Sequence, residues 1–465
     1  MIVLPQSLAD YYERFLRSVF HPSSVAEGID AWTNPDELEL QCRWFAGDFG
    51  RQFRGTDGEA IEIVQFGEWN RGAGPDFSNV VVQVNGESRR GDLELDTQDR
   101  DWEHHGHAEN PAYGDVQLHL FVVSSGRGRY FTRDHAHREV PQVRLELSVI
   151  DPRRWGQGEA ISRIGRCSTP LAGMSVADVE SLLAAAAQYR LKRKAQRFHR
   201  IADAHGRDEA LFQLSAEALG YRHNRLPATL LAQQLPLKLL RREKEAGEAL
   251  LFGAAGFLDR PTYEDAALEA RPYLRNLWET WWKRREPFGE GSRGKWRFSG
   301  ARPANHPHRR LGALSALVAR WRDYTRLVFD APWSKQSVTN FFASLEHHYW
   351  SNHYTLRSTA LPKPMKLVGE SRVTEILGNI LYPIAVEEDH KSWEDYEELP
   401  ARLGNEKTER AMIRLFGKRP DAEKFLRRVY QQQGLLQIYD DYCLADESDC
   451  RDCPFPEQLA KWNLP

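Results

Sequence analysis

Acidic side chains between residues 76 and 96 have the types and spacing of a divalent-metal site. Alternate side chains of a strand share a face, so Asp92, Glu94 and Asp96 are expected to point the same way. Asp76 follows a Gly-rich bend at the start of the partner strand, and a hairpin would bring it near Glu94. Carboxylates that leave coordination positions to water suit Mg²⁺ or Mn²⁺. Such an ion can generate hydroxide and stabilise the charge that develops at phosphorus.

Histidines follow this acidic strand. His104, His105 and His107 lie close together in sequence, and His119 shares a face of a later strand with Gln117. A second interpretation is open, because alternating acids often form the solvated face of a hairpin and clustered loop histidines are often accidental. The order of bend, hairpin, acidic strand, histidine segment and buried strand favours a site.

Local patterns predict the elements that hold these side chains. Residues 35–46 have apolar positions at helical spacing. Asn85-Gly86 separates two alternating segments, 77–84 and 91–96, and is a strong hairpin signal. The stretch 101–114 is expected to be a helix or a tight loop. Further strands are expected at 60–66, 115–123 and 143–150.

The predicted fold class is α+β, with a mixed-sheet α/β domain over residues 1–160. A larger and mostly helical domain with basic surfaces follows over 161–400, and a helical segment with a Cys-rich metal knuckle over 401–465. The 465 residues are 41% hydrophobic and 28% charged, which is typical of a soluble globular protein. The net charge of −3 does not by itself indicate nucleic acid.

Other sequence signals are negative. No apolar run reaches the length of about 18 residues needed for a membrane span, so no membrane partner is expected. The N-terminus lacks a basic stretch followed by an apolar one, which favours the cytoplasm. The sequence has no Walker, nucleophile-elbow or HExxH motif, and no GxGxxG motif that follows a predicted strand.

Cysteines cluster near the C-terminus at Cys443, Cys450 and Cys453. Three thiolates and one remote ligand would complete a structural Zn²⁺ site or a [4Fe–4S] cluster. Cys167 is the first candidate for the remote ligand and Cys42 the next. Thiols without a metal are the alternative.

Two basic segments are candidates for binding phosphates of nucleic acid. The first is a predicted helix and the second a rigid, Pro-containing, non-helical loop, and together they supply Arg190, Lys192, Arg193, Lys194, Arg197, Arg302, Arg309 and Arg310. The helix is also explained as a solvated charged surface, and the loop as a buttress for a neighbouring domain.

The order of the N-terminal elements resembles the PD-(D/E)xK nuclease superfamily. Pro75-Asp76 and Glu94-Leu95-Asp96 carry the resemblance. It implies that Asp76 and Glu94 bind Mg²⁺ or Mn²⁺ and that Glu39, on the preceding helix, adds a third contact.

The chain departs from that superfamily at one position. Asp96 stands where a lysine usually orients or activates the attacking water. Asp96 would then assist, and His107 or His119 would transfer the proton; otherwise catalysis is lost.

A longer resemblance, over nearly the whole chain, is to the bacterial domain-of-unknown-function family 2851. It rests on several stretches outside the acidic strand as well as on it: 67–77, 91–96, 101–107, 116–120, 218–227, 250–258 and 302–311. That family implies no activity.

The sequence therefore predicts a metal-dependent nuclease acting on DNA or RNA. A degenerate nuclease fold that binds nucleic acid or serves as a scaffold is the first alternative. A different hydrolase that uses the histidine cluster with Zn²⁺ is the second.

Overall fold

A computed structural model describes most of the chain. The described residues are 7–17, 37–70, 74–126, 132–147, 169–221, 224–244, 246–285, 295–298, 302–330, 332–401, 406–443, 455–460 and 462. They form two compact units, and each unit combines segments that are distant in sequence. Unit 1 comprises Met1–Asn34, Arg153–Arg197 and Val373–Pro465, and unit 2 comprises Pro35–Pro152 and Phe198–Arg372. The sequence prediction had only consecutive segments.

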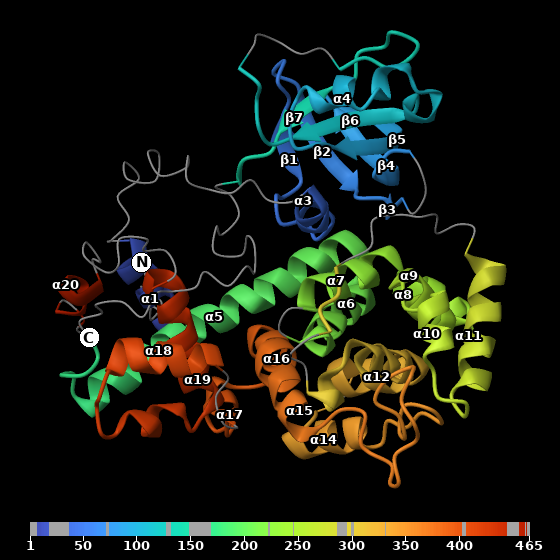
Figure 1. Cartoon of the computed structure of the whole chain (residues 1–465). Helices are drawn as coiled ribbons and strands as arrows, with labels where there is room; N and C mark the ends of the chain where they lie inside the picture. The colour runs from blue at the N-terminus through green and yellow to red at the C-terminus, as the bar shows by residue number, and fades with distance from the viewer. Residues whose placement is uncertain are drawn as a thin grey trace. The chain divides into compact units, whose positions relative to one another are not determined.

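Unit 2 contains a mixed β-sheet (Figure 1). Its strands are β1 Gln52–Arg54, β2 Ala60–Gln65, β3 Glu68–Trp69, β4 Phe77–Val84, β5 Glu87–Leu95, β6 Val116–Phe121 and β7 Gln142–Arg144. The order is β1-β2-β4-β5-β6-β7, and β3 pairs with β4. Pairing is antiparallel from β1 to β5, whereas β6 and β7 join in parallel.

The predicted hairpin is confirmed as β4 and β5. Asn85 and Gly86 join them with φ angles of 52° and 86°, the left-handed backbone that a two-residue type I′ turn requires. The next pairing, β5 with β6, is parallel and needs a crossover connection. Short helical segments form this crossover, namely α4 Asp101–His104 and the 3-10 turns η2 His107–Glu109 and η3 Pro111–Tyr113.

Aromatic packing places the crossover and the preceding helix against the sheet. Trp102 of α4 is completely buried and packs with Tyr113, Val116 and Val140. The predicted helix at 35–46 is α3, Glu37–Phe45, and the ring of its Phe45 stacks on Phe77 of β4 at 5.7 Å. Both elements therefore hold their polar side chains at fixed positions relative to β4 and β5.

The rest of unit 2 is helical, as predicted from residue 175 onward. Its helices are α6 Arg207–Gly220, α7 Arg225–Gln234, α8 Leu237–Arg242, α9 Gly247–Ala254, α10 Arg260–Glu264, α11 Arg271–Arg284, α12 Pro307–Ala319, α13 Trp321–Thr325 and α14 Lys335–Ala343. One prediction is wrong here. Pro307 starts α12, where a proline needs no backbone N–H, so residues 308–310 are helical and not part of a loop.

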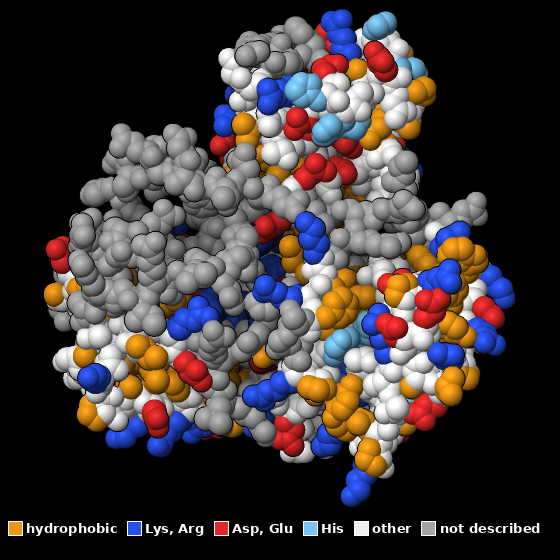
Figure 2. Space-filling view, in the orientation of Figure 1, with side chains coloured by type: hydrophobic (Ala, Val, Ile, Leu, Met, Phe, Trp, Pro, Cys, Tyr) orange, Lys and Arg blue, Asp and Glu red, His pale blue; other side chains and the backbone are white. Residues whose placement is uncertain are grey.

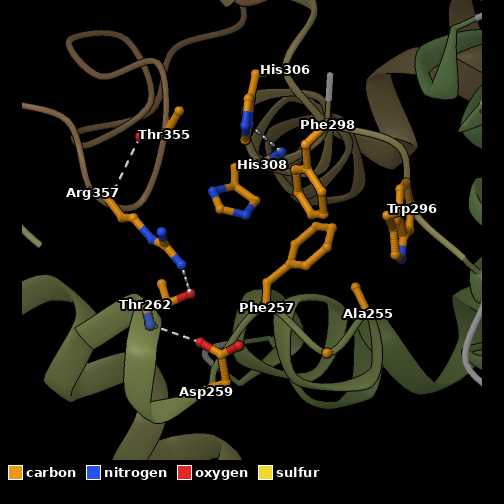
Figure 3. Close-up of a pocket in the computed structure, with 11 residues that line it drawn as sticks. Ala255, Phe257, Asp259, Thr262, Trp296, Phe298, His306, His308, Thr355 and Arg357 are labelled. Carbon is orange, nitrogen blue, oxygen red and sulfur yellow. Dashed lines mark hydrogen bonds between the residues drawn. The ribbon is translucent and has the colours of Figure 1, made fainter. Parts of the chain in front are cut away.

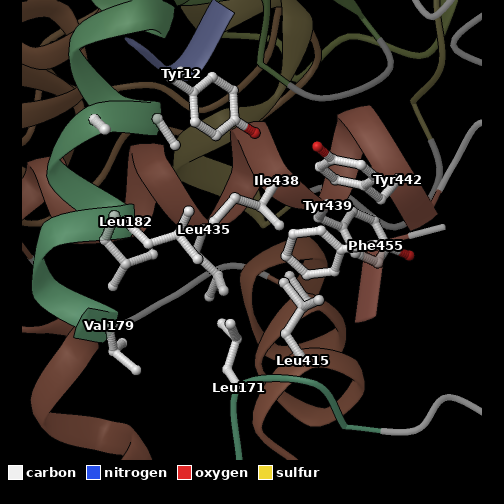
Figure 4. Packing of buried hydrophobic residues seen from close by; sticks show 14 of the residues in the cluster. Tyr12, Leu171, Val179, Leu182, Leu415, Leu435, Ile438, Tyr439, Tyr442 and Phe455 are labelled. Atoms are coloured by element: carbon white, nitrogen blue, oxygen red, sulfur yellow. The ribbon is translucent and has the colours of Figure 1, made fainter. Parts of the chain in front are cut away.

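Unit 1 is a helical assembly around one core. Its elements include α1 Leu8–Arg17, the first part of α5 Val176–His205, α16 Tyr382–Glu387, α17 Trp393–Glu397, α18 Glu406–Phe416, α19 Val429–Ile438 and α20 Phe455–Leu459. α15 Glu370–Ile376 lies at its boundary. Leu182, Leu435 and Ile438 pack at the centre of this core (Figure 4). In the described part of the chain, no helix is long and apolar enough to cross a membrane.

Candidate metal centre

The acidic end of β5 is buried. Glu94 and Asp96 are only 6% and 1% exposed, which contradicts the interpretation of these two acids as a solvated hairpin face. β5 is an interior strand, with β4 on one side and β6 on the other, and Glu94 lies opposite His119 in the parallel pair. Several acidic and histidine side chains lie together over the sheet in Figure 2. Asp92 remains half-buried, and burial followed by the charge of Asp115 raises its pKa.

Hydrogen bonds lock Asp76 beside Glu94, as the hairpin predicts. The backbone N–H of Asp76 donates to Glu94 Oε2 at 2.9 Å. Asp76 Oδ2 accepts from the backbone N–H of Leu95 at 3.0 Å, and Oδ1 accepts from Gln41 Nε2 at 2.7 Å. The start of β4 and the end of β5 are thereby tied together through side chains.

Burial and neighbouring negative charges raise the proton affinity of both carboxyl groups. Burial raises the pKa of Asp76 well above its usual range, and the charges of Glu94, Glu37 and Asp96 add to this effect. Burial and then the charge of Asp96 raise the pKa of Glu94 in the same way. Concentrated negative charge in a buried place favours either protons or a cation.

Two histidines complete a group of possible ligands with Asp96. The ligand atoms of Asp96, His105 and His107 all lie within 4.8 Å of one another. His105 Nδ1 is 3.1 Å from Asp96 Oδ1. His107 Nε2 is 3.2 Å from Glu94 Oε1 and 4.0 Å from Asp96 Oδ1.

His107 has the properties of a metal ligand. Its side chain is buried, and its Nε2 atom makes no hydrogen bond within the described residues although two carboxylates lie near it. Burial lowers the pKa of His107, so the ring is neutral and keeps a lone pair. Tyr113 stacks on the imidazole with centroids 4.0 Å apart and holds its plane. The residues present therefore fit a bound divalent cation.

His119 lies behind this group and is 0% exposed. Its Nε2 atom is 3.2 Å from Asp96 Oδ2, and its Nδ1 atom is 3.0 Å from Thr132 Oγ1 and 3.2 Å from Gln142 Nε2. Both ring nitrogens are thus engaged inside the protein. The predicted candidate His119 is in the cluster, but it contacts Asp96 and not solvent.

Helix α3 meets the cluster through Gln41, and the predicted ligand Glu39 lies on the same helix. Glu39 is 7% exposed and pairs with Arg43 at 3.3 Å. Glu37 and Gln41 lie one helical turn apart and are hydrogen-bonded at 3.1 Å, and Gln41 contacts Asp76. The sequence did contain a signal for this pair, because residues four positions apart, such as Glu37 and Gln41, are neighbours on a helix surface.

Most of the cysteines in the predicted metal knuckle lie outside the residues that the structure describes. Cys167, Cys450 and Cys453 lie outside the described residues. Cys443 is buried in the core of unit 1, and Cys42 is buried on α3 in unit 2. The zinc or [4Fe–4S] knuckle stays a prediction.

Most of the basic residues predicted on α5 make contacts inside unit 1. Arg190 donates to Gln433, Gln437 and Asp440 at 3.0–3.1 Å. The neighbouring cations of this helix make similar contacts: Lys192 with Asp10, Arg193 with Tyr189, and Lys194 with Asn379 and Gln433. Arg197 also lies on the helix. Ion pairs and hydrogen bonds within unit 1 therefore engage Arg190, Lys192 and Lys194.

Two residues of the second basic segment that were predicted to contact nucleic acid are buried. Arg309 is 1% exposed and donates to the backbone carbonyls of Trp350, His353, Met365 and Lys366. Arg310 is 6% exposed and donates to the carbonyl of Leu367. These guanidinium groups support the segment 350–367, which is the buttress interpretation, and only Arg302 of this set is exposed.

Comparison with known proteins identifies the family but no activity. The model of the family described as "Protein of unknown function (DUF2851)" matches residues 37–409. The chain belongs to this family. The predicted resemblance to family 2851 is thereby confirmed, whereas the resemblance to the PD-(D/E)xK superfamily stays a prediction. No curated protein and no solved structure matches the chain.

Proposed function

We propose that this protein is a metal-dependent nuclease that hydrolyses phosphodiester bonds of DNA or RNA. The observation that carries the proposal is the buried Nε2 atom of His107, which faces Glu94 and Asp96 without a hydrogen bond in the described chain. A cation at this place would satisfy that nitrogen and neutralise the carboxylates.

The order of elements supports the nuclease class. A helix, an antiparallel hairpin, a helical crossover and a parallel strand follow one another, with Pro75-Asp76 opening β4 and Glu94-Leu95-Asp96 ending β5. The PD-(D/E)xK resemblance expects acids at these two places. A similar order of elements does not by itself establish a function. The buried Nε2 atom of His107 beside two carboxylates is therefore the stronger support.

The donor set points to the kind of ion. Carboxylates suit Mg²⁺ and Mn²⁺, whereas imidazole suits Zn²⁺ and other transition metals. Because His107 and His105 join carboxylates here, we expect Mn²⁺ to bind better than Mg²⁺, with Zn²⁺ as the competitor. When bound, such an ion acts as a Lewis acid toward water and the phosphoryl oxygen.

The chain's own residues have separable roles in this proposal. Glu94, Asp96 and His107 hold the cation, and Asp76 fixes the carboxylate of Glu94 through its backbone N–H. His119 orients Asp96 and is a positioning residue, because it is completely buried. The side chain of His105 is 48% exposed, so it is the histidine of this group that can exchange a proton with a substrate or with solvent.

One observation favours a second function, nucleic-acid binding without cleavage. Both carboxylate oxygens of Asp76 already accept hydrogen bonds from Gln41 and Leu95. Asp96 also replaces the lysine that the superfamily uses. In this case the acidic cluster would hold an ion, or protons, for stability alone.

Metal binding and cleavage can be measured on the same preparations. EDTA-treated protein is titrated with Mn²⁺, Zn²⁺ and Mg²⁺ by calorimetry and is incubated with labelled single-stranded and duplex DNA and RNA. We expect one tight Mn²⁺ or Zn²⁺ site and metal-dependent cleavage, both lost in Glu94→Gln and Asp96→Asn. Glu62→Gln on the exposed face of β2 is the matched control. Full cleavage in both site variants would overturn the proposal, and metal binding without cleavage would favour the second function.

A further inference from the structure

A pocket of about 410 Å³ lies in the helical part of unit 2, in a region that the proposed metal centre does not use. Residues within 255–262, 296–298, 306–308 and 355–357 line it (Figure 3). Small-ligand sites usually have volumes of about 300–1,000 Å³. Two stretches on which the family resemblance rests, 250–258 and 302–311, meet here.

Flat aromatic rings form one wall of the pocket. Phe257 lies 5.1 Å from Trp296 and 5.6 Å from Phe298, measured between ring centroids. Phe298 is nevertheless 45% exposed. Aromatic side chains left accessible in a cavity provide a surface on which another planar ring can stack.

Two histidines beside this wall are neutral hydrogen-bond donors. The backbone N–H of His308 donates to His306 Nδ1, and the backbone N–H of Leu356 donates to His308 Nδ1, both at 3.2 Å. Because Nδ1 accepts in each ring, the proton of the neutral form lies on Nε2. Burial lowers the pKa of His306 to about 4 and that of His308 well below its usual range.

The opposite side of the pocket carries donors and acceptors with little net charge. Arg357 donates to Thr262 Oγ1 at 3.2 Å and pairs with Asp265 at 3.0 Å. The exposed Asp259 carboxylate accepts from the backbone N–H of Thr262 at 2.8 Å. Figure 3 shows Phe257, Phe298 and His308 together, with Arg357 and Thr262 across from them.

We propose that this pocket binds the base of an unpaired nucleotide, so that the protein binds single-stranded nucleic acid in preference to a duplex. This inference rests on the proposed function for the nature of the ligand. A nucleobase has a flat face for Phe298 and an edge with both donors and acceptors. The neutral imidazoles, Arg357 and Asp259 complement such an edge, whereas a purely anionic ligand would meet a carboxylate. Bases stack on aromatic side chains in most single-strand binding sites.

Binding is tested in EDTA, where the metal centre cannot act. Anisotropy of a labelled 12-nucleotide single strand and of its duplex is measured for wild type, Phe298→Ala and Leu268→Ala. Leu268 is 78% exposed outside the pocket and is the matched control for loss of a surface apolar side chain. We expect Phe298→Ala to weaken single-strand binding by about 5- to 150-fold, which corresponds to the usual range for one stacked base. Leu268→Ala should bind as wild type.

A second readout does not depend on Phe298. Nucleoside monophosphates should quench the emission of Trp296, seen as the difference between wild type and Trp296→Phe. Equal binding of single strand and duplex, unchanged affinity in Phe298→Ala, or no quenching of Trp296 would overturn the inference.

Failure of the pocket and failure of the metal centre are distinguishable. If the pocket is wrong, Glu94→Gln still abolishes metal binding. If the metal centre is wrong, the EDTA-treated protein still binds single strands through Phe298.

Discussion

Replacing Glu94 with glutamine separates the charge of the metal-free cluster from its packing. Glu94 Oε2 accepts the backbone N–H of Asp76 at 2.9 Å, and a glutamine oxygen can keep this bond. The substitution removes one negative charge from a buried place that also holds Asp96. We therefore expect Glu94→Gln to stabilise the metal-free protein wherever the pH is high enough to ionise Glu94, although it damages the proposed site.

The size of this effect follows from the distances at His107. Its Nε2 atom lies 3.2 Å from Glu94 Oε1 and 4.0 Å from Asp96 Oδ1. The two oxygens are thus within about 7 Å of each other, where unit charges repel by roughly 2 kcal/mol at an effective dielectric constant of about 20. A free-energy change of that size raises the midpoint of thermal unfolding by about 4–8 °C in a domain of about 150–250 residues.

The effect has a defined pH dependence. Burial and the charge of Asp96 raise the pKa of Glu94, so the folded protein keeps this proton to higher pH than the unfolded chain. The stability of metal-free wild type therefore falls as pH rises from the ordinary glutamate pKa, about 4.3, through the raised value. The extra stability of Glu94→Gln over wild type should be absent at about pH 4.3 and should reach its full size above the raised pKa of Glu94.

Bound metal should reverse the ranking. Mn²⁺ at about 100 times its dissociation constant stabilises the folded wild type by about 2.7 kcal/mol, and it should not stabilise Glu94→Gln. Differential scanning calorimetry of both proteins and of Glu62→Gln, at pH 4.5 and pH 8 with EDTA or Mn²⁺, measures all of these quantities. A lower midpoint for Glu94→Gln in EDTA at pH 8 would show that the chain itself compensates the charge, and the reasoning would be refuted.

Two further substitutions test the packing around these sites. Gly91→Ala should cost about 1–3 kcal/mol of stability, because the new Cβ would collide with the carbonyl oxygen of Asp115. At the control position, the new Cβ of Gly173→Ala meets open space, so stability should change little. Urea unfolding compares the two variants, and equal midpoints would contradict this packing. Arg309→Met should cost roughly 3 kcal/mol, since buried carbonyls left without donors lose about 1–3 kcal/mol each, and exposed Arg302→Met should be neutral in the same assay. If Arg309→Met is as stable as wild type but no longer binds nucleic acid, Arg309 contacts nucleic acid and its burial does not reflect a structural role.

Local sequence patterns were sufficient for the hairpin and for the approach of Asp76 to Glu94. Asn85-Gly86 specifies a turn by backbone conformation alone, and alternation places Glu94 and Asp96 on one face. Both signals act over a few residues, so they do not depend on the rest of the fold. The same is true of the long helical stretch from residue 176.

Burial depends on what packs from elsewhere, and here the sequence was an incomplete guide. The acidic end of β5 is buried because β6 pairs beside it and the crossover segment with Trp102 and His107 covers it. Gln41 of α3 reaches Asp76, and Phe45 of the same helix stacks on Phe77, so the position of α3 depends on contacts with β4.

The sequence by itself determined which residues had metal-binding chemistry and which lay near one another along the hairpin. Only the tertiary structure decided that a ring nitrogen of His107 has no hydrogen bond to any described residue, that His119 is enclosed, and that Arg309 is part of the interior. It also decided that residues within 255–262, 296–298, 306–308 and 355–357 share one pocket. The physical reason is that side-chain type and local spacing are properties of a short segment, whereas desolvation and the partners of a buried group come from segments distant in sequence.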